Sequence, residues 1–380
     1  MSADLTDALT LDLSATGLHG SGPTNYFTLH NLPTAQAVAL NPFLADAIVP
    51  LEPHRACAND PIDASRSYAS GAATLAWQVG GATIKSISSY SRLADENIGD
   101  DDSINLSAFP SHFISRSNTC SEELNVSGSL GPVDAGGRRV LHARRQLYEA
   151  ALRVPTGDLP APPNSSLQHE AIGYVTKTYA AFADATWRLS TRLRRLGGVR
   201  YSRDEQRVTQ DSYMNFGPAM RIATCPLQTN EIAFTSTTPR LGAQYDLSAD
   251  SNVYATFSKG FKIGGFNPYS CNNQYNPEKL TAYEIGIKNR LFDNILTLNA
   301  SAFYYDYSDL QLSQVVGLIR LITNAAAAEV KGAELEAVWQ PDIHWTINAN
   351  CRCSTPSTPI SPILTPSPRP WARRTSPATI

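Results

Sequence analysis

The chain has 380 residues, of which 17% are charged and 42% are hydrophobic, and its formal net charge is −3. This charge argues against a general nucleic-acid-binding protein, which would normally be basic. No run of about 18 consecutive apolar residues is present, so the sequence predicts no transmembrane helix. The opening stretch, MSADLTDALTL, has acidic residues where a signal peptide would have positive ones, so we expect no export signal in it.

Apolar and polar residues alternate along most of the chain. A period of two is typical of a strand whose two faces meet different surroundings, and the sequence therefore predicts an all-β protein. The clearest alternating segments are residues 9–16, 73–79, 179–187, 241–247, 253–258, 283–288, 296–304 and 332–339.

The connections between these segments have two sizes. Short turns are expected at residues 189–193, 247–252 and 291–296, and long polar connections at residues 17–70, 94–112, 204–234 and 260–280. This arrangement is typical of an antiparallel up-and-down barrel in an outer membrane. At about ten residues per spanning strand we expect roughly ten to twelve strands, about half of a 22-stranded barrel. The predicted fold is therefore an incomplete transmembrane β-barrel.

Aromatic residues near the expected strand ends fit the two girdles of such a barrel, where rings meet lipid headgroups. The alternative is that they form the core of a soluble β-sandwich. The residues concerned are Trp77, Trp187, Trp339, Tyr179, Tyr245, Tyr283 and Tyr304.

Two segments depart from the strand pattern, which divides the chain into barrel residues 1–130 and 173–350 and atypical residues 131–172 and 351–380. Residues 131–163 carry five arginines, and RVLHARRQLYEAAL within them could form a short basic helix that binds a partner. Residues 351–380 contain seven prolines, a density that no strand carries. We expect both atypical segments to be poorly ordered or non-strand, and we interpret them as out-of-frame translation.

Few residues suggest chemistry. The segment DENIGDDDS (95–103) could hold Ca²⁺, but its spacing does not match an EF-hand, and a solvated acidic loop is the favoured interpretation. No cluster of cysteine and histidine suggests zinc, so we expect no metal site. Cys225 and Cys271 could pair across neighbouring loops in an oxidising compartment, although free thiols are the favoured alternative.

Asp184, Glu284, Glu334 and Glu336 are the carboxylates expected to face the barrel interior. A pair of acids for glycosidase chemistry remains an alternative, while polar networks are ordinary in wide barrels. No catalytic motif is present, and we expect neither an enzyme nor a bound cofactor.

Several segments resemble the barrel of TonB-dependent outer-membrane receptors, over residues 1–130 and 173–350. The segments that carry the resemblance are YAAFADATWRLSTRLRRLGGVRYSRDE (179–205), TPRLGAQYDLSADSNVYATFSKGF (238–261), YATFSKGFKIGGFNP (254–268), LTAYEIGIKNRLFDNILTLNASAFYYDYSDLQL (280–312) and NAAAAEVKGAELEAVW (324–339). The resemblance implies an outer-membrane location and energised uptake of ferric siderophores or similarly large nutrients. It also implies a plug domain, and TonB as the partner that drives uptake.

The family's plug and TonB box precede its barrel, whereas this sequence opens on residues that resemble a barrel strand. We therefore expect a fragment that does not transport as written. The alternatives are a porin or surface adhesin that needs no plug, and a soluble β-sandwich binding protein.

Overall fold

The computed structural model describes residues 1–23, 35, 39, 45–48, 61–100, 105, 110–152, 167–215, 221–267, 270–316, 319–324 and 327–357. The strands are β1 (Ser2–Thr6), β2 (Leu9–Gly22), β3 (Asp63–Val79), β4 (Ala82–Asp100), β5 (Pro110–Leu130), β6 (Val133–Leu152), β7 (Leu167–Arg188), β8 (Leu193–Asn215), β9 (Arg221–Asp246), β10 (Ser251–Lys262), β11 (Gly265–Phe266), β12 (Gln274–Tyr275), β13 (Glu278–Leu291), β14 (Leu296–Ser308), β15 (Gln311–Val316), β16 (Ile319–Asn324), β17 (Ala327–Asp342) and β18 (Trp345–Ser357). In this described part of the chain, no helix is long and apolar enough to cross a membrane.

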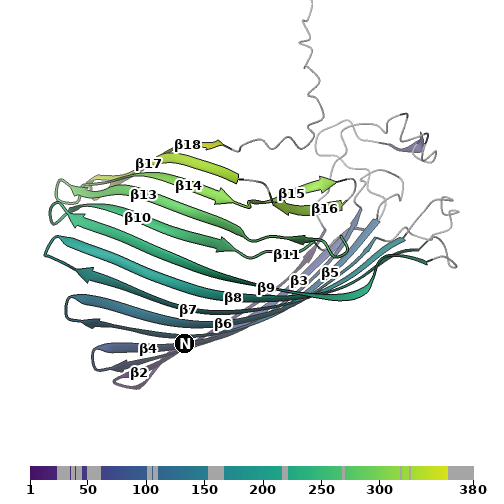
Figure 1. Ribbon diagram of the computed structural model, residues 1–380, viewed down its shortest axis with the longest axis horizontal. Helices are drawn as coiled ribbons and strands as arrows, with labels where there is room; N and C mark the ends of the chain where they lie inside the picture. Colours follow the sequence, from purple (N-terminus) through teal and green to yellow (C-terminus); the bar gives the residue numbers. More distant parts are fainter. Residues whose placement is uncertain are drawn as a thin grey trace, which may run out of the picture.

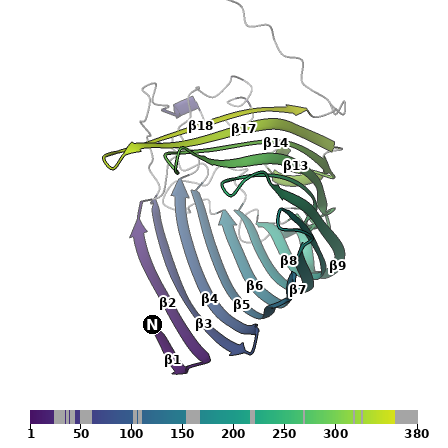
Figure 2. The ribbon, with the colours of Figure 1, turned by 90° about the vertical axis from the view of Figure 1, so that its left-hand side faces the viewer.

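Fourteen strands form one antiparallel sheet that follows the order of the chain. β10 lies beside β13 and β14 beside β17, because the small hairpins β11–β12 and β15–β16 occupy the connections between them. The sheet curls strongly, and its edge strands β1 and β18 are not paired with each other (Figure 1, Figure 2). The predicted up-and-down, incomplete barrel is confirmed, with more strands than the roughly ten to twelve expected.

Short turns join the strands at one rim of the sheet. The turns expected at residues 189–193, 247–252 and 291–296 are confirmed, and they join β7 to β8, β9 to β10 and β13 to β14. Gly80, between β3 and β4, has φ 58°, and Gly131, between β5 and β6, has φ 61°. Glycine adopts this left-handed conformation at no steric cost, which is why it occupies such tight turns.

At the opposite rim the strands are longer than the sequence predicted. β8 has 23 residues and β9 has 26, so most of residues 204–234, expected as a loop, belongs to these two strands. A tilted strand crosses a bilayer with about nine to eleven residues, so both strands extend well beyond it. The prediction was wrong because outside lipid both faces of a paired strand can be polar, and the alternation then disappears.

Part of the segment 131–172 is also strand, where none was expected. β6 covers Val133–Leu152 and pairs along its length with β5 and with β7, which begins at Leu167. The sequence RVLHARRQLYEAAL is therefore not a helix, because ladder hydrogen bonds on both sides outweigh a weak local preference. Residues 153–166 lie outside the described residues, and the out-of-frame origin concerns the gene and stays a prediction.

The expectation that residues 351–380 do not form a strand is wrong for residues 351–357. β18 continues to Ser357 and includes Pro356, which lies opposite Val330 on the neighbouring strand. A proline fits here because β18 is an edge strand, where a missing backbone N–H need not break a ladder. Residues 358–380 lie outside the described residues.

The face of the sheet turned away from its hollow carries the expected aromatic bands. Trp187 lies beside the short-turn rim, and Tyr179 lies eight residues away on the same face of β7. Eight residues make about 26 Å of strand, or about 20 Å of height at a 40° tilt, close to the roughly 25 Å apolar band of membrane barrels. The predicted girdle residues exposed on this face are Trp77, Trp187, Trp339, Tyr179, Tyr245 and Tyr283.

A row of rings crosses three strands at the level of Tyr283. The ring centroid of Tyr283 lies 5.3 Å from that of Phe257 on β10 and 6.3 Å from that of Tyr304 on β14. Tyr304 thus joins the girdle as the sequence predicted. Neighbouring rings in such a row stabilise the sheet by cross-strand contact.

Candidate functional site

The connection between β10 and β13 folds into the hollow of the sheet and packs against its wall. Phe266 of β11 is 2% exposed, and it contacts Ile172 of β7 and Val208 of β8, which are both fully buried. Tyr174 and Ile232 pack around this cluster. Full burial of a phenylalanine side chain stabilises by about 1.5–3 kcal/mol. The β11–β12 hairpin is therefore docked on β7–β9, as Figure 1 shows for β11.

Two glycines allow this close approach. A Cβ at Gly264 would lie 2.5 Å from the carbonyl oxygen of Tyr275 and 2.8 Å from Cζ of Phe234. A Cβ at Gly265 would lie 2.7 Å from Oε1 of Gln206. The close packing of this hairpin on the wall therefore requires glycine at both positions, which lie in the segment YATFSKGFKIGGFNP. Burial raises the pKa of the Tyr275 phenol above its ordinary value of 10.0.

Polar contacts hold the same connection to its neighbours. The Tyr174 hydroxyl donates to the carbonyl oxygen of Phe266 at 3.3 Å, and Nε2 of Gln210 donates to that of Asn267 at 3.2 Å. The Asn267 side chain pairs with the backbone of Ile322 on β16: its Nδ2 donates to the carbonyl at 2.9 Å, and its Oδ1 accepts from the N–H at 2.6 Å. Asn267 is fully buried, so these bonds compensate for the loss of its hydration. The amide therefore joins the two small hairpins.

A disulfide bond joins Cys225 of β9 to Cys271 in the same connection, across 46 residues. The pairing that the sequence suggested is confirmed, and the favoured alternative of free thiols is wrong for these two residues. Pairing could not be decided from spacing alone, because the partners meet only when the connection folds back over β9. Nε2 of Gln228 lies within hydrogen-bonding distance of both sulfur atoms.

The four carboxylates that the sequence singled out do not form one site. Asp184 lies on β7, and three strands separate it from Glu284 on β13. Glu284 accepts a hydrogen bond of 2.5 Å from the Tyr254 hydroxyl on β10. The Tyr254 ring covers Gly286, its cross-strand partner, where a Cβ would lie 2.6 Å from the hydroxyl oxygen. The glycine therefore makes room for the ring.

Glu334 and Glu336 lie on β17, and each has its own partner. Nε of Arg352 lies 3.3 Å from Oε1 of Glu334, and Nδ2 of Asn299 donates to Glu336 at 3.3 Å. These contacts account for both acids as members of an interior polar network.

The acidic segment 95–103 was expected as a solvated loop, and this is wrong for residues 95–100, which belong to β4 and are paired with β3 and β5. Asp95 pairs with Arg66 at 2.8 Å, and Glu96 lies 2.7 Å from Nε2 of His112. Residues 101–103 lie outside the described residues. Within the described ranges, no three of His, Cys, Asp and Glu are placed to hold a metal ion together.

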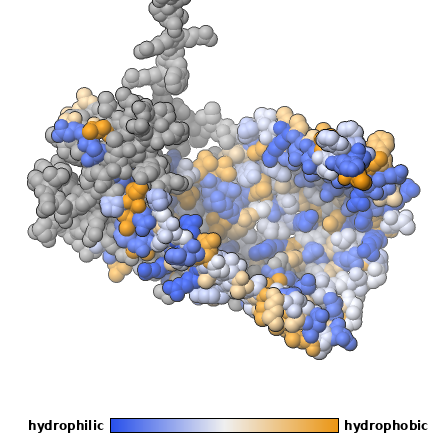
Figure 3. Space-filling view, turned by 180° about the vertical axis from the view of Figure 1, so that it is seen from behind, coloured by the Kyte–Doolittle hydropathy of each residue, from blue (hydrophilic) through white to orange (hydrophobic). Residues whose placement is uncertain are grey.

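The curled sheet and the docked β10–β13 connection together line a hollow. Seen from behind, it is a recess in which hydrophilic and hydrophobic residues are intermixed (Figure 3). Fold and site together define one class of protein: a membrane-spanning antiparallel barrel wall with an outer connection folded into its interior.

Comparison with known proteins gives the family. The family model "TonB dependent receptor-like, beta-barrel" matches residues 11–352, and the chain belongs to this family. Its members are transport receptors of the outer membrane, which is where the chain is placed. The porin, adhesin and soluble β-sandwich alternatives do not agree with this match.

Individual relatives match only over part of their length. The pesticin receptor of Yersinia enterocolitica is 33% identical over 201 residues, which are 51% of this chain and 28% of that receptor. The ferric yersiniabactin uptake receptor FyuA of Yersinia pestis has the same fold, with a TM-score of 0.72 and 20% identity over 92% of this chain and 50% of that one. The ferric-catecholate import receptor Fiu of E. coli K12 has a TM-score of 0.63 and 17% identity, over 93% of this chain and 56% of that one. The chain thus spans about half the length of the two solved receptors, and its match to the pesticin receptor covers 28% of that protein.

Proposed function

We propose that the chain forms part of the barrel wall of a receptor that takes up ferric siderophores, or similarly large and scarce nutrients, through the outer membrane. The observation that carries this proposal is the β10–β13 connection, which is folded into the hollow and fixed there by the Cys225–Cys271 disulfide. A fixed inner connection narrows the hollow and gives a large ligand a shaped, polar surface. The solved structures named for uptake of ferric yersiniabactin and for import of a ferric catecholate support this class of ligand.

Two further assignments belong to the proposal. TonB is the partner that would supply energy to the complete receptor, as the family name implies. The role is transport without catalysis, since the interior acids Glu284, Glu334 and Glu336 each have a separate hydrogen-bonding or ion-pairing partner.

Direct binding tests the proposal. The full chain, refolded in neutral detergent, is titrated with ferric yersiniabactin, a ferric catecholate and a ferric hydroxamate, and quenching of tryptophan fluorescence is followed. We expect saturable quenching by at least one ferric complex and much weaker quenching by the same siderophore without iron. Absence of saturable binding by all three classes would refute the proposed substrate class.

A further inference from the structure

The Cys225–Cys271 disulfide has one buried end and one exposed end. Cys225 on β9 is 4% exposed, whereas Cys271, in the loop between β11 and β12, is exposed. A thiolate breaks a disulfide by attacking one of its sulfur atoms, and access decides which of the two is attacked. A dissolved thiol therefore meets this bond at Cys271, and Cys225 is the side chain that would leave.

A β-bulge places a hydrogen-bond donor beside this bond. In the β8–β9 register Gln228 lies opposite Gln210 and Cys225 lies opposite Ser212, so between these pairs two residues of β9 stand against one of β8. Residues three apart on a regular strand point to opposite faces, and the bulge brings Gln228 and Cys225 to the same face. Nε2 of Gln228 lies 3.0 Å from Sγ of Cys225 and 2.7 Å from Sγ of Cys271.

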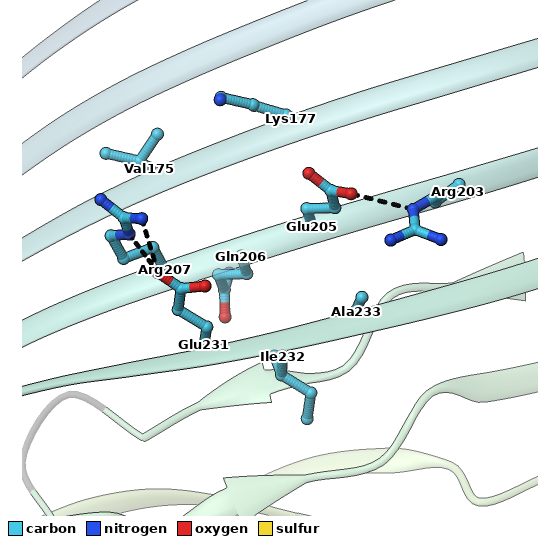
Figure 4. Close-up of a pocket in the computed structure, with 9 residues that line it drawn as sticks. All are labelled: Val175, Lys177, Arg203, Glu205, Gln206, Arg207, Glu231, Ile232 and Ala233. Carbon is cyan, nitrogen blue, oxygen red and sulfur yellow. Dashed lines mark hydrogen bonds and ion pairs between the residues drawn. The ribbon is translucent and has the colours of Figure 1, made fainter.

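The amide and the bond lie on the inner side of the wall. Gln228 shares the alternation of Ile232, which packs against the docked cluster and points from β9 toward the small strands drawn below it in Figure 4. The ion pair between Arg207 and Glu231, also drawn there, belongs to the outward face. The disulfide therefore lies on the other side of the sheet from these charges.

The Gln228 amide suits a thiolate better than it suits the intact bond. A neutral cysteine sulfur accepts hydrogen bonds weakly, whereas a hydrogen bond to a charged acceptor is roughly twice as strong as a neutral one. A donor fixed beside the sulfur stabilises the thiolate and speeds its departure in exchange. Gln228 is therefore placed to assist Cys225 as the leaving group.

The loop that carries Cys271 is held by contacts of its own. The Asn273 backbone N–H donates to the carbonyl oxygen of Ser270 at 3.3 Å, and Nδ2 of Asn273 donates to Oγ of Ser270 at 3.2 Å. Nδ2 of Asn267 donates to Oδ1 of Asn273 at 3.1 Å. These bonds involve neither sulfur atom, so an opened Cys271 stays near Cys225 at high effective concentration and the bond can form again.

We propose that this disulfide is an exchange site for a low-molecular-weight thiol, and that exchange there controls how tightly the β10–β13 connection is held to the wall. The thiolate of the small molecule attacks Sγ of Cys271 and forms a mixed disulfide with it. The bond to Cys225 breaks, and its electron pair stays on Cys225 as a thiolate beside Gln228. The small thiol is oxidised in this step and Cys225 is reduced, so no other oxidant or reductant takes part. Attack by Cys225 on the mixed disulfide reverses the step.

The test follows the reaction of the full chain with reduced glutathione in neutral detergent, after the cysteines other than Cys225 and Cys271 have been replaced by serine. Samples are quenched with iodoacetamide, which alkylates the thiol that has left, and peptide mass spectrometry locates the glutathione adduct. Hydrogen exchange at the Ile322 N–H, which donates to Asn267, follows the docking of the connection. The test variant is Gln228→Leu, which removes the donor. The matched control is Gln340→Leu, at the short-turn end of β17.

We expect the adduct on Cys271 to exceed that on Cys225 by at least about tenfold, because the buried sulfur is shielded. Gln228→Leu should slow adduct formation about three- to tenfold, since part of the hydrogen bond to the leaving thiolate has formed in the transition state, and Gln340→Leu should not. Gln228→Glu also lacks the donor and adds a negative charge, so it should react more slowly still. This second variant keeps the test valid if the leucine variant does not fold. The Ile322 N–H should exchange several-fold faster in the adduct than in the disulfide form.

Four results would overturn the proposal. They are the absence of an adduct, an adduct mainly on Cys225, a Gln228 variant that folds and reacts at the wild-type rate, and an Ile322 N–H whose exchange is the same in the adduct and in the disulfide form. No ferric complex is present in any arm, so the outcome does not depend on the proposed substrate class.

Discussion

Replacing Phe266 by alanine should weaken the docking of the β11–β12 hairpin on the barrel wall, while the Cys225–Cys271 disulfide still tethers the β10–β13 connection to β9. The side chain is 2% exposed and packs on Ile172 and Val208, so its removal leaves a cavity that a rigid sheet cannot fill by collapse. Deletion of a buried phenylalanine costs about 3–5 kcal/mol. Because docking is a local equilibrium, the fraction of undocked hairpin should rise by about 100-fold to 5,000-fold, at about 1.4 kcal/mol per factor of ten.

Hydrogen exchange measures this fraction at a defined group. The Ile322 backbone N–H donates to Oδ1 of Asn267 at 2.6 Å, so it exchanges only when the two hairpins separate. In the Phe266→Ala chain its exchange should accelerate by the same factor. Exchange in the β13–β14 ladder should not change, since those strands pair with each other independently of the hairpin.

The matched control is Phe292→Ala, at a phenylalanine that is 72% exposed in the turn at the opposite rim. It removes the same atoms but should leave the Ile322 amide unaffected. An acceleration below about tenfold in Phe266→Ala, far less than the cost of a buried cavity, would show that the hairpin is not held by its buried ring. Equal acceleration in both variants would lead to the same conclusion.

Three further outcomes follow from the described contacts. Replacing Cys225 and Cys271 together by serine should lower the free energy of unfolding by about 4 kcal/mol, from the entropy of a 46-residue closure, and a thermal melt that matches the wild type would contradict this. Gly332→Ala should destabilise the sheet by about 1–3 kcal/mol, because the new Cβ would lie 2.5 Å from Cζ of Phe303. Gly20→Ala is the control and should not destabilise the sheet, because a Cβ there has nothing within 4 Å. The denaturant midpoints of the two variants measure the difference. Burial raises the pKa of Tyr275 in the folded protein above 10.0. The contribution of this side chain to the free energy of unfolding is therefore complete below pH 10.0 and is lost as the pH rises through the raised pKa of the folded state. In wild type, the amides of the β11–β12 hairpin should lose protection from hydrogen exchange at alkaline pH, and Tyr275→Phe should remove this loss. If the pH profile of exchange is the same in the variant, Tyr275 is not the cause of the loss.

The sequence alone determined the wall of this protein. Alternation shows which face of each spanning strand meets lipid, since the bilayer imposes a local, period-two constraint on every such strand. Turn residues are local as well, which is why the short connections at 189–193, 247–252 and 291–296 were predicted correctly. Trp187 and Tyr179 mark the limits of the apolar band for the same reason.

Only the tertiary structure decided what happens beyond the bilayer and inside the hollow. β6 and the outer halves of β8 and β9 are strands because neighbouring strands pair with them, and no pattern within their own residues shows this. Phe266 reaches Ile172 across more than ninety residues of chain, and Cys271 meets Cys225 only because the β10–β13 connection folds back over β9. Such contacts follow from strand pairing and chain return, which are non-local, whereas the lipid acts on each residue directly.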